Sequence, residues 1–172
     1  MKFITIGAYG FSEAAFFQTL QRAGVDTFCD LRWRRGVRGA EYAFVNSARL
    51  QKRLAELGIR YLHFRDLAPS PAVRQAQFEA DKKQGIAKRK RSVLGESFIA
   101  AYRQERLSAF DSRKFIEELG TEAQRVALFC VEREPAACHR SLLAARLQHD
   151  LGEQCEVSNL KPELPAEKGA GG

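Results

Sequence analysis

The sequence contains no long hydrophobic run. None of its apolar stretches approaches the roughly 20 consecutive residues that cross a bilayer as a helix, so we expect no association with a membrane. The first residues, MKFITIG, read as the start of a strand. They lack the long apolar segment and small-residue cleavage site of a secretory signal peptide. We therefore expect a cytoplasmic protein.

The motifs of several common binding sites are also missing. Gly7 and Gly10 form neither a G-x-G-x-x-G fingerprint nor a P-loop, and we expect no cofactor. The cysteines lack the C-x(2–4)-C spacing of structural zinc sites, and an adjacent pair such as Cys138 and His139 rarely reaches one ion together, so no metal is expected. With nothing to mark secretion, we expect all the thiols to be free: Cys29, Cys130, Cys138 and Cys155.

Positive charge is in excess. The chain has 28 Lys and Arg against 21 Asp and Glu, a net charge of +7. This balance favours anionic partners, such as nucleic acid, nucleotides or phosphorylated small molecules, but it indicates attraction rather than a function. A length of 172 residues fits one domain, and a hydrophobic content of 45% is enough to bury a core.

Strand-like and helix-like segments alternate along the chain. Each helix between two strands starts at a capping residue such as Ser12 or Asp111 and ends at a glycine such as Gly24 or Gly58. The pattern predicts a single α/β domain over residues 1–160, with a mostly parallel, Rossmann-like sheet flanked by helices. The expected strands are 2–6, 25–31, 59–64, 125–130 and, less regularly, 155–157. The unbroken apolar run from Val126 is typical of a central strand that is covered on both faces.

Two segments interrupt this alternation. Residues 70–95 form a basic helical or loop insertion, whose Lys82–Arg91 stretch we interpret as solvated surface, with a phosphate-contacting arm as the alternative. Residues 161–172 are rich in Pro, Lys, Glu and Gly, a composition that predicts a disordered tail.

Polar residues gather where the expected strands end. In a parallel sheet, ligands bind beyond the carboxyl ends of the strands. Three such ends carry a pair of residues at spacing two, which places both members on one face of an extended chain. If these strands are neighbours in the sheet, the pairs converge on one site. The pairs are Asp30 with Arg32, Tyr61 with His63, and Cys130 with Glu132.

The helix after the fourth expected strand begins near Cys138, His139 and Arg140. A helix start presents free N–H groups and a positive dipole end, so we expect Arg140, with Arg32, to bind an anion there. The dipole and the neighbouring cations lower the pKa of Cys138, which makes it a candidate nucleophile. Glu132 and His139 are candidates for proton transfer.

Each of these assignments has a simpler alternative. Cys130 and Cys138 could be small core residues, and Glu132 an exposed loop carboxylate. Arg140 could form a salt bridge with Asp30 or with Glu132.

Taken together, these motifs resemble the family called domain of unknown function 488. Its members carry an Ile-Gly turn, a D-[VL]-R strand end and C-x-E-x(5)-C-H-R, which here read Ile6-Gly7, Asp30-Leu31-Arg32 and Cys130 to Arg140. The resemblance implies a compact α/β domain with one shared site, whose activity the family name leaves open. Two loops depart from the family pattern, Trp33–Arg38 and Leu67–Pro69. We therefore expect their substrate contacts to differ from those of other family members.

Three functions fit these features. The first is an enzyme acting on a phosphorylated or nucleic-acid-derived anionic substrate. The second is a non-catalytic nucleic-acid-binding module that uses the basic residues 32–38 and 82–91. The third is a buried ion network of Asp30, Arg32, Glu132 and Arg140 that fixes the fold without catalysis. The sequence carries no signal of an oligomeric state.

Overall fold

The computed structural model describes residues 1–163, so the predicted tail, 161–172, lies outside the described residues from position 164 onward. One sheet of five strands forms the centre of the molecule, and all of its pairings are parallel. The strand order is β3-β2-β4-β1-β5, which confirms the predicted α/β fold. The strands are β1 Lys2–Ile6, β2 Thr27–Asp30, β3 Arg60–His63, β4 Arg125–Phe129 and β5 Glu156–Leu160.

β4 is the central strand, as its apolar run predicts. Its residues from Val126 to Phe129 are fully buried. Ala127 pairs with Ile4 of β1 on one side and with Phe28 of β2 on the other. β1 and β2 are consecutive in the chain, but β4 separates them in the sheet. The carboxyl end of β4 therefore lies between those of β1 and β2.

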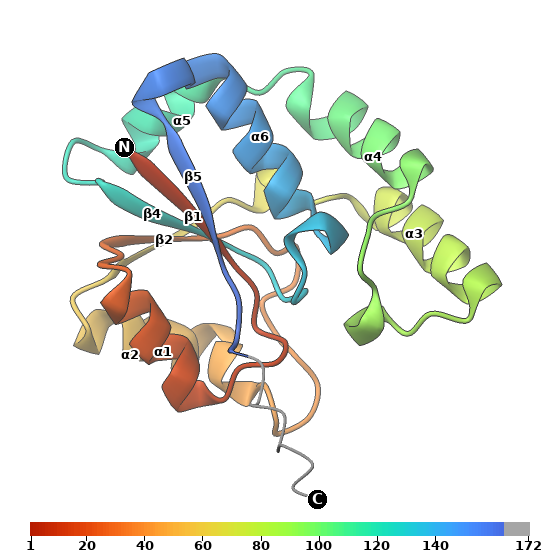
Figure 1. Ribbon diagram of the computed structural model, residues 1–172, viewed down its shortest axis with the longest axis horizontal. Helices are drawn as coiled ribbons and strands as arrows, with labels where there is room; N and C mark the ends of the chain where they lie inside the picture. The colour runs from red at the N-terminus through yellow and green to blue at the C-terminus, as the bar shows by residue number, and fades with distance from the viewer. Residues whose placement is uncertain (164–172) are drawn as a thin grey trace, which may run out of the picture.

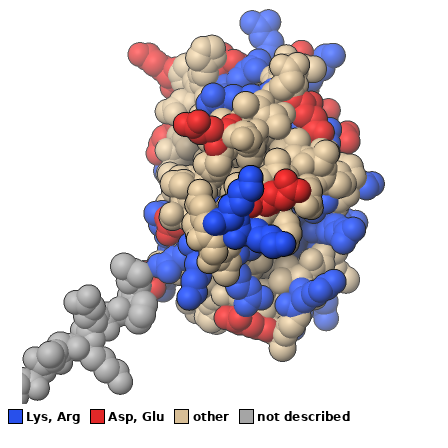
Figure 2. Space-filling view, turned by 90° about the vertical axis from the view of Figure 1, so that its right-hand side faces the viewer, with Lys and Arg blue, Asp and Glu red and all other residues tan. Residues whose placement is uncertain are grey.

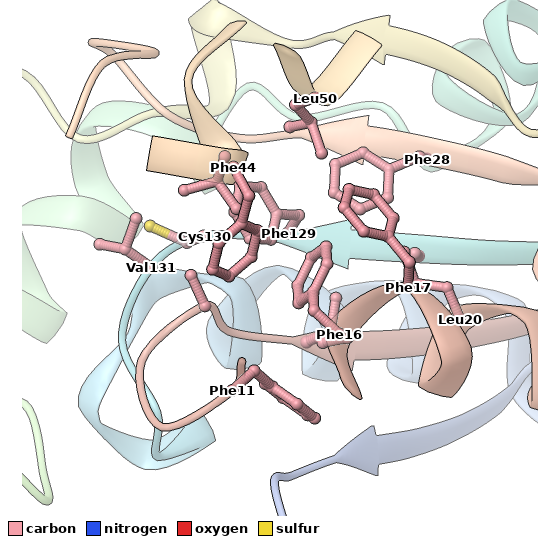
Figure 3. Close-up of a cluster of buried hydrophobic side chains, with 14 of the residues drawn as sticks. Phe11, Phe16, Phe17, Leu20, Phe28, Phe44, Leu50, Phe129, Cys130 and Val131 are labelled. Carbon is pink, nitrogen blue, oxygen red and sulfur yellow. The ribbon is translucent and has the colours of Figure 1, made fainter. Parts of the chain in front are cut away.

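Helices cover both faces of the sheet (Figure 1). On one face lie α1 (Glu13–Arg22) and α2 (Ser47–Glu56), and on the other α5 (Ser112–Leu119) and α6 (His139–Leu151). Ser12 caps α1 as predicted, because its hydroxyl accepts the Ala15 N–H. An aromatic cluster fills the α1 face, with the Phe16 and Phe129 ring centres 5.7 Å apart (Figure 3). This cluster ends at Cys130, where β4 gives way to the loop that carries the C-x-E motif.

The insertion stands beside the carboxyl end of the sheet (Figure 1). It contains α3 (Pro71–Gln84) and a short 3-10 turn at Lys88–Lys90, and α4 (Glu96–Tyr102) follows it directly. α3 packs on α4, and α4 packs on α6. Ser70 caps α3, and Gly85 ends it in the left-handed conformation that glycine tolerates, at φ 67°. No helix within residues 1–163 has the length and apolar character needed to cross a membrane.

Candidate active site

A cavity of about 470 Å³ opens at the carboxyl end of the sheet. Its lining comes from four segments that are far apart in the sequence: the loop after β1, the loop after β2, residues 69–98 with the insertion, and the loop after β4 together with the first turn of α6. Parallel strands bring their carboxyl ends to one edge, which explains why these segments meet. Five of the predicted site residues line the cavity: Arg32, Cys130, Glu132, Cys138 and His139.

Asp30 holds the Arg32 side chain in place at one side of the cavity. The fully buried Asp30 carboxylate accepts from Arg32 Nε at 2.8 Å and from Nη2 at 2.7 Å. The Tyr61 hydroxyl donates to the same carboxylate at 2.8 Å, and burial followed by the Asp30 charge raises the pKa of Tyr61 to about 12. Arg32 Nη1 is buried and has no hydrogen-bond partner among the described residues. An unpartnered buried donor on a residue that lines the cavity makes Arg32 a candidate ligand contact.

Two thiols and an imidazole form the floor. Cys130, Cys138 and His139 are all buried, and one donor atom from each lies within 4.8 Å of the other two. Cys138 is the N-cap residue of α6, and its Sγ lies 3.7 Å from His139 Nδ1. The other ring nitrogen, Nε2, lies 3.0 Å from the Leu31 carbonyl oxygen. Because a carbonyl only accepts, Nε2 carries a proton and donates it to Leu31.

The charges at the floor favour a Cys138 thiolate. Burial alone raises the pKa of Cys138, but the hydrogen bond from Cys130 and the nearby His139 and Arg140 charges lower it well below its ordinary value. The bond to Cys138, together with burial, holds the pKa of Cys130 well above its ordinary value. Burial opposes the charge on His139, but the Cys138 thiolate raises the pKa of this imidazole. These shifts favour the thiolate form of Cys138, the protonated form of His139 and the neutral form of Cys130.

Glu132 links this floor to the insertion. Its Oε1 accepts from Arg91 Nη2 at 3.1 Å and lies 3.6 Å from Lys88 Nζ. Its other oxygen, Oε2, is buried and has no hydrogen-bond partner within residues 1–163. Arg91 also pairs with Asp81 at 2.9 Å. Glu132 is therefore a buried carboxylate rather than the exposed loop residue of the simpler interpretation.

The insertion forms one wall of the cavity. Lys88, Arg89 and Arg91 all line it, and the Arg89 guanidinium lies 5.2 Å from the centre of the Tyr9 ring and 5.1 Å from that of Tyr42. The sequence predicts mainly solvated surface for Lys82–Arg91, and residues 82–90 are indeed exposed, whereas the Arg91 side chain is largely buried against Asp81 and Glu132. The weak apolar periodicity of the insertion reflects α3, which contacts the core only along a narrow strip. No local pattern in the sequence reveals that the charges of the insertion face Glu132.

Three predicted residues, Asp30, His63 and Arg140, lie behind the cavity rather than on its lining. His63 Nε2 lies 2.9 Å from the Arg32 carbonyl oxygen and so supports the loop after β2. Arg140 is fully buried, and its guanidinium donates to the Glu132 carbonyl at 2.6 Å and to the Arg133 carbonyl at 3.1 Å. This placement makes Arg140 a positioning residue for the C-x-E loop and offers no support for direct anion binding.

Basic side chains outnumber acidic ones around the opening. Seven Lys or Arg residues line the cavity, but only two acidic residues, Asp81 and Glu132, do so. Arg34, Arg38 and Arg74 have no acidic partner within ion-pair distance among residues 1–163. Lys and Arg side chains are prominent across the middle and lower part of the face that carries the insertion (Figure 2). The electrostatic field of this opening therefore attracts anions.

A family model, domain of unknown function DUF488, matches residues 12–147 of the 172-residue chain. The chain belongs to this family. The match includes the Asp30-x-Arg32, Cys130-x-Glu132 and Cys138-His139-Arg140 motifs, so the cavity floor of this DUF488 protein lies within the family's shared region. Neither the curated proteins nor the solved structures gave a match.

Proposed function

We propose that this DUF488 protein is an enzyme that acts on an anionic substrate, either phosphorylated or derived from nucleic acid, bound in the cavity. The observation that carries the proposal is the combination of uncompensated arginines with a buried thiol, imidazole and carboxylate in one cavity. Neither part alone suffices, because basic surfaces are common and buried cysteines are usually inert. Their convergence from four distant segments favours a built site.

The anionic group of the substrate has a natural place between Arg32 and Arg74. Arg32 supplies the buried Nη1 donor, and Arg74 has a buried Nε with no hydrogen-bond partner among the described residues. Burial, and next the charge of Arg34, lowers the pKa of the Arg74 guanidinium. An anion at this position relieves both effects, because it neutralises the repulsion and supplies acceptors. Guanidinium groups bind phosphate oxygens through paired N–H donors.

The apolar part of the lining suits a planar substrate group. Tyr9, Trp33 and Phe78 line the same cavity, and Phe78 is 60% exposed. Aromatic rings of this kind stack on nucleobases, and a cavity of about 470 Å³ is large enough for a nucleotide-sized ligand. The substrate class that fits best is therefore a nucleotide-like or other phosphorylated compound with a flat apolar part.

The reacting atom of such a substrate lies over Cys138 and His139 in this proposal. Glu132 serves as the proton-transfer group, because Oε2 is free while Oε1 is held by Arg91. Asp30, His63 and Arg140 hold these groups in place from behind the lining.

Calorimetric titration of the full chain with inorganic phosphate and with a nucleoside monophosphate tests the anion site. We expect Arg74→Gln to weaken binding by about ten- to a hundredfold, since a hydrogen bond to a charged group is worth roughly 1.5–3 kcal/mol. Arg113→Gln is the matched control, because it removes the same charge from exposed Arg113, which does not line the cavity. If ligand binding weakens equally in both variants, the loss comes from the change in net charge alone, which would contradict a built site.

Turnover is the second part of the test. A panel of phosphorylated compounds and nucleotides is incubated with the protein, and products are separated by chromatography. We expect Glu132→Gln and Cys138→Ser to abolish turnover, with ligand binding retained in at least Glu132→Gln. Oligonucleotide binding that falls steeply with salt, without turnover of any compound, would instead support the non-catalytic nucleic-acid module.

A further inference from the structure

We propose that Cys130, Cys138 and His139 bind a divalent metal ion of the zinc type at the floor of the cavity. The three donor atoms come from the end of β4 and the start of α6 and lie within 4.8 Å of one another. Zinc–sulfur and zinc–nitrogen bonds of about 2.3 and 2.0 Å place two ligand atoms of a tetrahedral ion roughly 3.5–3.8 Å apart. The 3.7 Å between Cys138 Sγ and His139 Nδ1 already fits. The remaining separations, both from Cys130 Sγ, need to close by about 1.3 Å at most.

The orientation of the His139 ring is a second, independent observation. Nε2 donates to the Leu31 carbonyl at 3.0 Å, and this bond turns Nδ1 toward Cys138. A histidine that binds a metal through one nitrogen almost always donates the other N–H to a carbonyl or a carboxylate, which fixes the ring and its tautomer. Leu31 directly follows β2, so the sheet itself holds the ring in this orientation.

The backbone explains how neighbouring residues reach one ion. Cys138 is extended, at φ −141° and ψ 142°, whereas His139 is the first residue of α6. This change of conformation brings the two side chains together instead of separating them. Two features of the sequence argue against a metal, the missing C-x(2–4)-C spacing and the rarity with which adjacent Cys and His share an ion, and this geometry answers the second. Two sulfurs and an imidazole favour zinc over magnesium or calcium, which prefer oxygen ligands.

The site has the ligand number of a catalytic centre. Three protein ligands with a fourth position open to the substrate are typical of catalytic zinc, whereas structural zinc has four protein ligands. All three proposed ligands line the cavity, as does Glu132 with its free Oε2. A water molecule in the open position would have a proton acceptor nearby, as metal-assisted hydrolysis requires. The metal site thus deepens the proposed function by supplying its reactive group.

Titration with cobalt(II) tests the metal site directly. The full chain is treated with a chelator, kept reduced with a phosphine and titrated with Co²⁺ while its absorption is recorded. We expect one ion per chain, the intense visible bands of tetrahedral cobalt, a sulfur-to-cobalt charge-transfer band, and displacement of both signals by Zn²⁺. Cys138→Ser and His139→Gln should weaken binding at least tenfold, and Cys155→Ala, the control for loss of a buried thiol elsewhere, should leave it unchanged.

The outcomes separate the metal site from the proposed function. No charge-transfer band with the folded wild-type chain, or unchanged cobalt affinity in Cys138→Ser, would overturn the metal site. Should a ligand variant fail to fold, alkylation of the wild-type chain decides, because bound Zn²⁺ must protect Cys130 and Cys138 from iodoacetamide but not Cys155. A chain that binds cobalt but no phosphorylated ligand keeps the metal site and refutes the anionic substrate. A chain that binds phosphate but no metal keeps the anionic substrate and refutes the metal site.

Discussion

Gly7 is the residue whose replacement tests the geometry of the C-x-E loop most sharply. It directly follows β1, and a Cβ atom at this position would lie 1.8 Å from the Glu132 carbonyl oxygen and 2.7 Å from its carbon. The same Cβ would lie 3.3 Å from Arg140 Nη2. These two closest contacts are with backbone atoms, so no side-chain rotation relieves them. Gly7→Ala must therefore push the Cys130–Glu132 segment away from the end of β1.

Hydrogen bonds between the two loops resist this displacement, so Gly7→Ala should lower the stability of the protein. The Ala8 and Tyr9 N–H groups both donate to the Val131 carbonyl, at 3.1 and 3.0 Å, and tie the two loops together. Overpacking in a tight site costs about 1–3 kcal/mol, and a backbone clash belongs at the upper end of that range. For a domain of this size, each kcal/mol lowers the melting temperature by roughly 2–4 °C. We expect Gly7→Ala to melt about 6–12 °C below the wild type.

Thermal unfolding followed by circular dichroism measures this difference. Gly36→Ala is the matched control, because a Cβ at Gly36 meets no atom within 4 Å and this glycine does not need a positive φ. Gly36→Ala should have the same melting temperature as the wild type. If Gly7→Ala also melts with the wild type, the close approach of Gly7 to Glu132 is refuted, and with it the account of how the loop is positioned.

Two further substitutions probe groups behind the cavity, and a third probes an ion pair at the far end of α6. Arg140→Met should lower the free energy of unfolding in urea by about 3 kcal/mol or more, because two charge-assisted hydrogen bonds to backbone carbonyls, one of them buried, are lost. An unchanged urea midpoint would contradict this role. Tyr61→Phe should cost about 1 kcal/mol through loss of its bond to Asp30, and a variant as stable as the wild type would show that this bond contributes nothing. The Ser112 hydroxyl, ahead of other partners, lowers the pKa of Asp150 from 3.8 to about 2, so its stabilisation is present above about pH 4 and lost as pH falls toward 2. Asp150→Asn should therefore be slightly less stable than the wild type at pH 7, by less than about 1 kcal/mol in free energy of unfolding for so exposed a group, and equally stable at pH 2. A stability difference that stays constant with pH would refute the linkage.

The sequence predicts the parallel sheet and its strands well, and it selects residues that meet at one cavity. Period-two and period-3.6 patterns report burial, and the unbroken Val126–Phe129 run identifies the strand that is covered on both faces. The rule that ligands bind at the carboxyl ends of parallel strands then selects the motifs at Asp30 and Cys130. These ends are neighbours because β4 pairs with β2.

What the sequence could not supply are the contacts between distant segments. The place of β4 between β1 and β2 follows from tertiary packing, and no local pattern encodes it. Arg140 illustrates the consequence: its position at a helix start favours anion binding, but the approach of Gly7 brings backbone carbonyls within its reach. The insertion is a second case, because the charges of Lys88 and Arg91 acquire a role only opposite Glu132.

We propose above that the cavity over Cys138 and His139 binds an anionic ligand. A crystal of the full chain soaked with inorganic phosphate tests it most directly. We expect a phosphate inside the cavity, with an oxygen about 3 Å from Arg32 Nη1 and another facing Arg74. Phosphate bound only on the outer surface, with water alone against Arg32 Nη1, would contradict it.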